Sequence, residues 1–270
     1  MGNRETVALV IATYNWPGAL RLLLESILVQ DILPEEILIA DDGSDLSTKI
    51  LIDDFRNRSF IDIKHFWQEH NGFQKSTILN RAIAGTSCNY IIQIDGDIVL
   101  HPHFIRDHLA VAERGCYIRG SRVMLSEEKS NQFLETGRIE KISLFSNGIR
   151  NRFNSLRVPI LSRLFIKKNK SSRNFRGCNC AYWKTDFIGV NGYNNAFKGW
   201  GHEDIELAAR FINAGIFQKK AKLLAVCYHL HHEVVDMQQE PVNFSIYQST
   251  LNLGVKYCLS GYNSSQEQYK

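Results

Sequence analysis

Two short stretches of this 270-residue chain hold acidic pairs in settings that suit chemistry. Trp200–Asp204 (WGHED) comes at the expected start of a helix, and Asp95–Asp97 (DGD) ends the apolar run that begins at Tyr90. An acidic pair at a strand end suits a hard divalent cation, and one beside an indole suits a general base. Two such sites on one α/β scaffold predict transfer of a group from an anionic, metal-bound donor to a hydroxyl acceptor.

Each pair also has a plainer interpretation. The DGD sequence is common in acidic turns, and acids in the first turn of a helix stabilise its dipole. However, burying Asp95 and Asp97 after an apolar strand is costly unless something compensates their charge. A cation that bridges to phosphate oxygens would do so, and Gly96 would let backbone and ligand approach closely.

The elements that must position these residues alternate between strand and helix in the first half of the chain. Strands are expected at 7–12, 36–40, 61–67 and 90–94, and helices at 20–28, 45–55 and 76–84. This rhythm predicts βαβ units and an α/β fold with a mainly parallel sheet and flanking helices. Polar clusters follow three of the strands, at 13–15, 41–42 and 95–97, so we expect them at the ligand-binding edge.

The second half has weaker patterns. A helix is expected near 102–114, a strand near 117–125, structured chain again at 176–184 and a helix from Glu203. A strand at 222–228 and an amphipathic helix at 243–259 follow, and 167–174 (KKNKSSRN) has the composition of a mobile loop. No internal repeat or linker interrupts the pattern, which predicts one domain.

The charge is unevenly distributed. Residues 138–176 contain eleven Lys or Arg and one acid, a net +10, which leaves −6 for the rest of a chain whose total is +4. The segment is either a solvated loop or a surface that meets anionic lipid or a lipid-linked acceptor. Nucleic-acid binding is disfavoured because no recognised module accompanies the cations and the acidic remainder would repel phosphate.

Several function classes are excluded or disfavoured. No G-x-G-x-x-G follows the first strand and no G-x-x-x-x-G-K-[ST] occurs, against a nicotinamide-binding domain and a P-loop NTPase. No apolar run approaches the roughly 20 residues that span a bilayer, and the N-terminus has no secretory pattern. Among six cysteines only Cys178 and Cys180 are close, as C-x-C, so reduced thiols and a cytoplasmic location are expected.

Six motifs together give the chain a resemblance to a known family. They are VIATYN at 10–15, ADDGS at 40–44, NGFQKSTILNRAI at 71–83, IDGD at 94–97, RGCNCAYWKTDF at 176–187 and GWGHED at 199–204. Over roughly residues 5–235 the chain resembles the family 2 inverting glycosyltransferases of GT-A fold. Within them it is similar to the branch with a galactosyltransferase-type C-terminal region, as in bacterial chondroitin polymerases.

The resemblance implies a GT-A domain at 1–242, with a nucleotide-sugar half (1–125) and an acceptor half (126–242), followed by a C-terminal helix and tail at 243–270. It implies metal-dependent transfer of a sugar, from a UDP-sugar or alternatively a GDP- or dTDP-sugar, to a hydroxyl of a glycan or lipid-linked glycan. Bacterial surface polysaccharide or lipopolysaccharide, made at the inner face of the membrane, is the expected product. The alternative of another class is a non-catalytic nucleotide- or sugar-binding protein.

For the donor, the resemblance implies that Thr13 and Tyr14 line the base and ribose pocket. Asp42 would accept the base N–H, and Asp95 would lie near the ribose or the metal. The phosphate side of the pocket would be formed by Lys75, Asn80 and Arg81. A solvated helix face is the plainer interpretation of Lys75 and Arg81.

For the acceptor, Asp204 matches the catalytic base, which would take the proton from the attacking hydroxyl in a single inverting displacement. Glu203 would hold an acceptor hydroxyl and Trp200 would stack on a sugar face. Asp97 would bind the metal together with His229, or with His231 as the alternative by strand alternation. Carboxylate plus imidazole favours Mn²⁺ over Mg²⁺.

Overall fold

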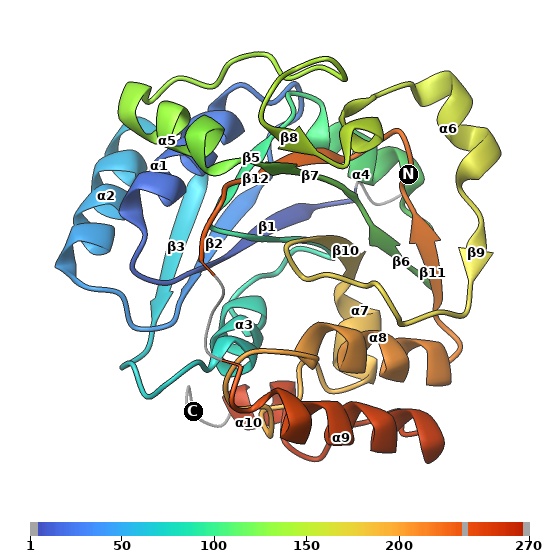
Figure 1. Cartoon of the computed structure of the whole chain (residues 1–270). Coiled ribbons are helices and arrows are strands. Elements are labelled where there is room, and N and C mark those ends of the chain that lie inside the picture. Colours follow the sequence, from blue (N-terminus) through green and yellow to red (C-terminus); the bar gives the residue numbers. More distant parts are fainter. Residues whose placement is uncertain (1–4, 234–236, 267–270) are drawn as a thin grey trace.

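The first four long strands form the parallel sheet that the alternating pattern predicts. In the computed structural model, which describes residues 5–233 and 237–266, their order is β3 (Asp62–Trp67), β2 (Glu36–Asp41), β1 (Val7–Thr13) and β4 (Tyr90–Asp95). Strand β1 is buried along its whole length because helices cover both faces of the sheet. Helices α1 (Pro17–Leu28) and α2 (Leu46–Arg58) pack on one face and α3 (Lys75–Ala84) on the other (Figure 1).

Beyond β4 the sheet becomes mixed. Strand β10 (Asn179–Trp183) runs antiparallel between β4 and β6 (Cys116–Arg119), and β11 (Phe217–Lys220) lies parallel to β6. The short strand β9 (Lys168–Asn169) closes this edge by pairing with β11. The stretch 167–174, expected to be a loop, therefore contributes a strand.

A second sheet, which the sequence did not predict, lies beside the first. In the described residues its order is β5 (Ile98–Leu100), β12 (Val226–His229), β7 (Ser121–Leu125) and β8 (Ile149–Arg150). The strand expected at 117–125 is split at Gly120, where a Cβ would lie 2.1 Å from Oδ1 of Asn179. The strand expected at 222–228 begins only at Val226, because Leu223 and Ala225 adopt positive φ angles of 64° and 48°.

The remaining helices are short or peripheral. They are α4 (Phe104–Val111), α5 (Glu127–Thr136), the 3₁₀ turn η1 (Arg152–Ser155), α6 (Pro159–Phe165), α7 (Lys184–Gly189), α8 (Glu203–Asn213), α9 (Glu240–Asn252) and α10 (Tyr262–Gln266). Helix α9 begins and ends earlier than the expected 243–259, and Gly254 just beyond it has a φ of +62°. Residues 267–270 of the expected tail lie outside the described residues.

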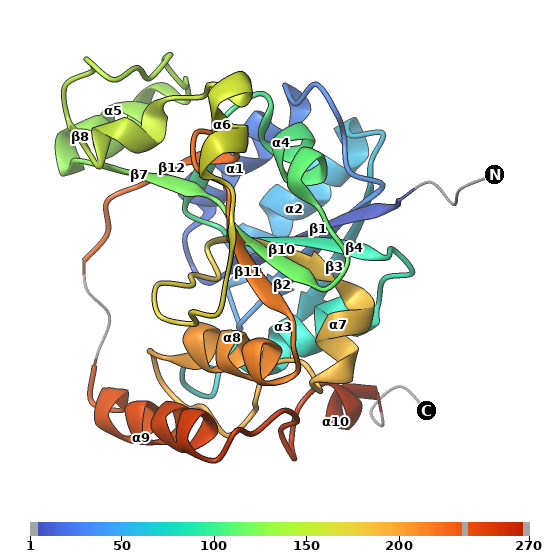
Figure 2. The same ribbon diagram turned by 90° about the vertical axis from the view of Figure 1, so that its right-hand side faces the viewer.

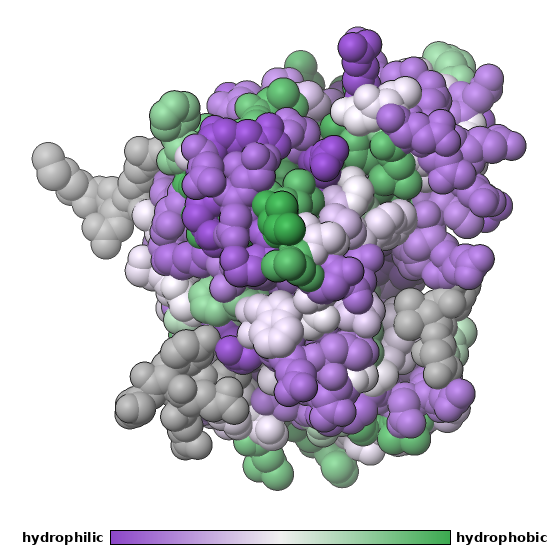
Figure 3. Space-filling model, turned by 90° about the vertical axis from the view of Figure 1, so that its left-hand side faces the viewer, coloured by the Kyte–Doolittle hydropathy of each residue, from purple (hydrophilic) through white to green (hydrophobic). Residues whose placement is uncertain are grey.

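The arrangement places the two halves of the chain around one edge of the central sheet. Helices α8 and α9 lie next to each other on the same side of the sheet as α3 (Figure 2). On the face that carries α2, the surface is mostly hydrophilic with apolar side chains in small groups (Figure 3). In the described part of the chain, no helix is long and apolar enough to cross a membrane.

Candidate active site

An open cavity of about 680 Å³ lies at the carboxyl ends of β1, β2 and β4. Seven of the residues predicted from sequence line it: Thr13, Tyr14, Asp42, Lys75, Asp95, Asp97 and Trp200. The sequence analysis missed other lining side chains, among them Trp16, His70, Phe73, His232, Gln238 and Gln239. The three polar strand ends therefore meet at one site, as the parallel topology predicts.

An aromatic pair forms one wall of the cavity. Tyr14 stacks on His70, with ring centroids 4.6 Å apart and planes inclined by 16°. Nearby, Asp42 accepts hydrogen bonds from the Gln74 backbone N–H at 2.7 Å and from Gln68 Nε2 at 2.6 Å. Burial raises the pKa of Asp42, although both hydrogen bonds favour its charged form. The wall thus offers stacking surface beside a fixed carboxylate.

The glycine of the DGD motif is required by a close approach of two backbones. The Gly96 N–H donates to the carbonyl of Ala12 at 2.7 Å, and a Cβ at Gly96 would lie 2.9 Å from Oγ1 of Thr13. A side chain there would push β1 away from the β4–β5 turn. Gly96 therefore lets Asp95 and Asp97 both reach the cavity.

Lys75 connects the two acidic pairs. Its Nζ lies 2.6 Å from Oδ1 of Asp95. Burial disfavours the charged lysine, but Asp95, Asp204 and Glu203 together hold the pKa of Lys75 well above its ordinary value. One cation at the start of α3 thus compensates carboxylates from both halves of the chain.

The carboxylate of Asp204 is fixed by two donors. The Gly177 N–H donates to its Oδ2 at 2.7 Å and the Tyr193 hydroxyl to its Oδ1 at 3.1 Å. The adjacent Glu203 accepts from the Gly201 N–H at 3.1 Å. Burial and the neighbouring Asp204 raise the pKa of Glu203 to about 7, although Lys75 opposes this shift. Neither carboxylate lines the large cavity itself; Gly199 and Trp200, just before them, do.

The loop before α8 is held by helix α9. Gly199, Gly201 and His202 all have positive φ angles, so the chain turns sharply into the helix. Asn243 donates to the carbonyls of Lys198 at 3.0 Å and Trp200 at 3.3 Å. The C-terminal helix therefore positions the indole at the mouth of the cavity.

Three potential metal ligands converge beside the DGD turn. Ligand atoms of Asp97, His229 and His232 all lie within 4.8 Å of one another. The Nδ1 atoms of His229 and His232 lie 2.8 and 2.7 Å from the carbonyl oxygens of Leu230 and Glu233. A carbonyl oxygen can only accept, so each Nδ1 is the donor and each Nε2 is left facing Asp97 as the atom that could bind a metal.

The carboxylate of Asp97 fits this interpretation. Both Nε2 atoms lie 3.4 Å from its Oδ2, and its Oδ1 is buried without a hydrogen-bond partner. Burial and the neighbouring Asp95 raise the pKa of Asp97, although His229 and His232 oppose this shift. Two imidazoles and one under-coordinated carboxylate are a donor set that suits a divalent cation.

Two of the predicted donor residues do not line the cavity. Asn80 is fully buried and faces away from the cavity: its side chain exchanges hydrogen bonds with the Tyr193 backbone at 2.8 and 2.9 Å and donates to Asn195. Arg81 does not line the cavity either. Of the residues of α3, all of which lie in the described part of the chain, Lys75 and Ile78 line the cavity.

His231, the alternative metal ligand, is not among the three grouped ligands. His231 is exposed, and its backbone N–H donates to Ser130 at 2.8 Å. Strand β12 ends at His229, so side-chain alternation does not extend to His231. The third candidate ligand is His232, which no strand pattern indicates.

Comparisons with known proteins define the class to which this fold and site belong. Residues 8–175 match Glycosyl transferase family 2, and residues 162–233 match the N-terminal domain of galactosyltransferase. The chain therefore belongs to glycosyl transferase family 2, and the resemblance inferred from its motifs is confirmed.

Curated relatives are distant and longer. The chain is 26% identical to validoxylamine A glucosyltransferase of Streptomyces hygroscopicus subsp. limoneus, over 78% of the chain and 48% of that protein. It is 24% identical to chondroitin synthase of Escherichia coli, over 83% and 34%, and 23% identical to hyaluronan synthase of Pasteurella multocida, over 79% and 23%. The chain thus matches about half or less of the length of each.

Solved structures share the fold. TarS 1–349 of S. aureus in complex with UDP superposes with a TM-score of 0.64 at 14% identity, over 97% of this chain and 69% of that one. The complex of the same protein with UDP-GlcNAc also has a TM-score of 0.64, at 13% identity, over 97% and 70%. This likeness confirms the GT-A fold and, at such low identity, nothing beyond it.

Proposed function

We propose that the chain is a metal-dependent inverting glycosyltransferase that moves a sugar from a UDP-sugar to a hydroxyl of a glycan or lipid-linked glycan. The observation that carries the proposal is the position of Lys75 between two acidic pairs, Asp95 with Asp97 and Glu203 with Asp204. Family membership supports the reaction class. The UDP complex of a structural neighbour supports the donor nucleotide.

In this proposal the cavity holds the donor. The nucleotide base would stack against the wall formed by Tyr14 and His70. Asp42 would accept a hydrogen bond from the base N–H, which favours uracil. A divalent cation, Mn²⁺ or Mg²⁺, held by Asp97, His229 and His232 would supply positive charge to the departing diphosphate. Lys75 would contribute a second positive charge at the same side.

Asp204 would be the general base. Its two hydrogen bonds, from Gly177 and Tyr193, hold one orientation of the carboxylate before the acceptor arrives. The acceptor hydroxyl would donate to Asp204 as its oxygen attacks C1 opposite the diphosphate. Glu203 would hold a neighbouring hydroxyl, and Trp200 would stack on the sugar face.

The donor assignment is tested by thermal unfolding with UDP, GDP, CDP and dTDP, each with and without Mn²⁺. A ligand at about 100 times its dissociation constant adds roughly 2.7 kcal/mol to the free energy of unfolding, which raises the unfolding temperature by several degrees. A shift with UDP that depends on Mn²⁺ is expected. A higher unfolding temperature with another nucleotide would change the proposed donor to a sugar of that nucleotide. No change with any nucleotide would favour a non-catalytic protein.

The base assignment is tested by Asp204→Asn. Transfer should fall by about 10²–10⁴-fold, because the amide cannot accept the proton, while UDP affinity stays within a few-fold. Asp186→Asn, on α7 outside the site, is the matched control. Transfer that survives in the Asp204 variant would show that another group is the base.

The basic segment supports a proposal on location. On α6, Ile160 and Leu164 are 84% and 68% exposed, next to the cations of residues 138–176. We propose that this surface meets anionic lipid at the inner face of the membrane, where a lipid-linked acceptor would be found. The protein should bind phosphatidylglycerol vesicles in a salt-sensitive manner and phosphatidylcholine vesicles weakly.

Matched variants separate vesicle binding by this surface from non-specific binding through any exposed apolar side chain. Ile160→Ser with Leu164→Ser should weaken vesicle binding, whereas Leu46→Ser, on α2 and also 68% exposed, should not. Equal binding to neutral and anionic vesicles would reject the membrane contact.

A further inference from the structure

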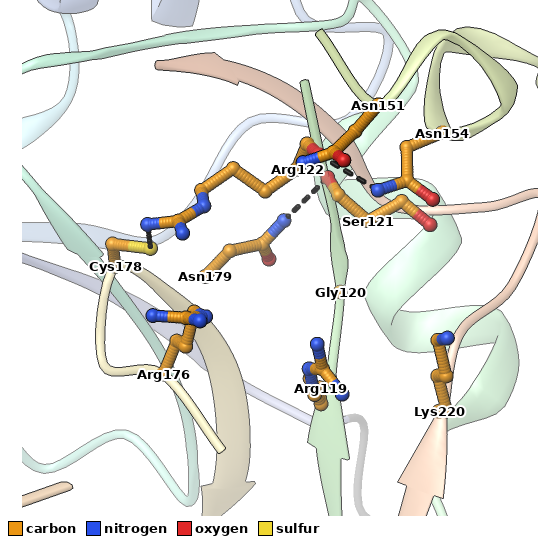
Figure 4. Close-up of a pocket in the computed structure, with 10 residues that line it drawn as sticks. All are labelled: Arg119, Gly120, Ser121, Arg122, Asn151, Asn154, Arg176, Cys178, Asn179 and Lys220. Carbon is orange, nitrogen blue, oxygen red and sulfur yellow. Dashed lines mark hydrogen bonds between the residues drawn. The ribbon is translucent and has the colours of Figure 1, made fainter. Parts of the chain in front are cut away.

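A second, smaller cavity lies where the two sheets meet. Its volume is about 120 Å³, against the roughly 10–15 Å³ that one water needs, so it has room for a group of several heavy atoms. Its lining comes from β6, β7, β11, η1 with the residue before it, and the start of β10 with the turn before it (Figure 4): Arg119, Gly120, Ser121, Arg122, Asn151, Asn154, Arg176, Cys178, Asn179 and Lys220. None of these residues lines the larger cavity.

The lining is strongly cationic. Four of its side chains, Arg119, Arg122, Arg176 and Lys220, are basic, and no carboxylate is among the lining residues. Arg119 and Lys220 lie opposite each other on the paired strands β6 and β11. Arg122 reaches the sulfur of Cys178 at 3.4 Å. Within residues 5–233 and 237–266, no ion pair compensates Arg119, Arg176 or Lys220.

The like charges act on one another. Burial lowers the pKa of Arg119, and the nearby Arg176 and Arg122 lower it further. Burial also lowers the pKa of Lys220, with added repulsion from Arg119 and Lys222. Cations crowded in a partly buried site are unfavourable unless an anion compensates them. The fold therefore maintains an uncompensated positive site.

The walls of this site are rigid. The Asn179 side chain donates to the carbonyls of Ser121 at 3.1 Å and Ala225 at 2.9 Å, and its Oδ1 lies 2.9 Å from Nε2 of His108. Asn154 donates to the carbonyl of Arg122 at 2.8 Å. The neutral polar side chains thus brace the backbone and leave the cations to face the cavity.

The cavity adjoins the proposed base. Arg176 and Cys178 line it, and the residue between them, Gly177, donates its N–H to Asp204 at 2.7 Å. A Cβ at Gly177 would lie 2.3 Å from Oδ1 of Asp204, so the two segments are in direct contact. A ligand group held by Arg176 would place its neighbouring atoms on the acceptor side of the site.

We propose that this cavity binds an anionic group, a phosphate or a carboxylate, of the acceptor glycan. Holding that group beside Arg119, Arg176 and Lys220 orients the acceptor so that its hydroxyl reaches Asp204. Bidentate guanidinium contacts suit either anion. The inference rests on the proposed function for the role of Asp204, but not for the binding of an anion.

Anion binding is tested with inorganic phosphate while saturating UDP and Mn²⁺ fill the larger cavity. Phosphate should raise the unfolding temperature above that in chloride at equal ionic strength. The double variant Arg119→Gln with Lys220→Gln, and separately the exposed Arg176→Gln, should bind phosphate at least 5-fold more weakly. Arg163→Gln with Lys167→Gln, two exposed cations outside the cavity, should match the wild type. Equal phosphate binding by all of these proteins would overturn the site.

The source of the anion is tested with glucose 6-phosphate, glucuronate and glucose as probes. Preference for the first identifies a phosphorylated acceptor and preference for the second an acidic sugar; no preference over glucose overturns the proposal. A failure of the anion site can be distinguished from a failure of the proposed function. If phosphate binds at these cations but UDP does not bind, the anion site stands and its assignment to a glycosyl acceptor is rejected.

Discussion

The ammonium of Lys75 lies 2.6 Å from the carboxylate of Asp95, and its charge is also stabilised by Glu203 and Asp204. The first helix turn of α3 thereby links a strand end in the first half of the chain to a helix start in the second. Lys75→Gln should lower the free energy of unfolding at pH 8 by roughly 1–3 kcal/mol, because three carboxylates lose their shared counter-charge. Urea titration measures this change.

The matched control for this variant is Lys49→Gln. Lys49 also contacts a carboxylate, that of Asp53, but its side chain is 58% exposed, so its loss should change stability by less than about 1 kcal/mol. Equal losses of unfolding free energy in the Lys75 and Lys49 variants would contradict the role of Lys75 in linking the two halves of the chain.

The second prediction concerns the metal. His232→Ala should weaken Mn²⁺ binding by about 10–100-fold, because it removes one of the three proposed ligands, Asp97, His229 and His232. His231→Ala is a close control, since the adjacent imidazole is exposed and, among the described residues, His231 forms a hydrogen bond only through its backbone N–H, to Ser130. Titration of Mn²⁺ by electron paramagnetic resonance measures both affinities. Stronger loss in the His231 variant would reverse the ligand assignment.

The donor side of the site was predictable because its residues follow regular strands. Thr13, Asp42 and Asp97 each lie at or within two residues of the end of a buried parallel strand, and such strand ends share one edge of a sheet. A local pattern and a general topological rule were enough to bring them together.

Other parts depend on contacts that no local pattern encodes. At the split, the Asn179 side chain occupies the space that a Cβ of Gly120 would need, and it comes from a strand that is distant in sequence although adjacent in the sheet. His232 follows the end of β12, so its direction is determined by the loop. The cationic cavity depends on the pairing of Arg119 with Lys220 across β6 and β11.

The third prediction concerns Asn80 and its contacts with the Tyr193 backbone. Asn80→Ala should lower the free energy of unfolding by about 2–3 kcal/mol, because the buried backbone groups of Tyr193 lose their partners. UDP affinity of the folded protein should stay unchanged, since Asn80 does not line the cavity. Asn194→Ala, which loses only a local contact with Ala196, should cost less than about 1 kcal/mol. A tenfold loss of UDP affinity in the Asn80 variant would restore it to the donor site.

The fourth prediction concerns the dependence of stability on pH. Burial and Asp204 raise the pKa of Glu203 from 4.5 to about 7. Between these values the folded protein holds a proton that the unfolded chain has released, so stability falls as pH rises through this window. Glu203→Gln keeps the neutral form at every pH, and its stability relative to the wild type should therefore rise by roughly 1–3 kcal/mol between pH 4.5 and 8.

Urea titrations of both proteins at pH 4.5, 6, 7 and 8 measure this difference. Glu128→Gln, at an exposed position in the first turn of α5, is the control and should show no comparable change with pH. Parallel stability curves for the wild type and the Glu203 variant would mean that the pKa of Glu203 is the same in the folded and unfolded states. Stability curves that separate only above pH 4.5 would instead show that Glu203 keeps its proton in the folded protein after the unfolded chain has released it.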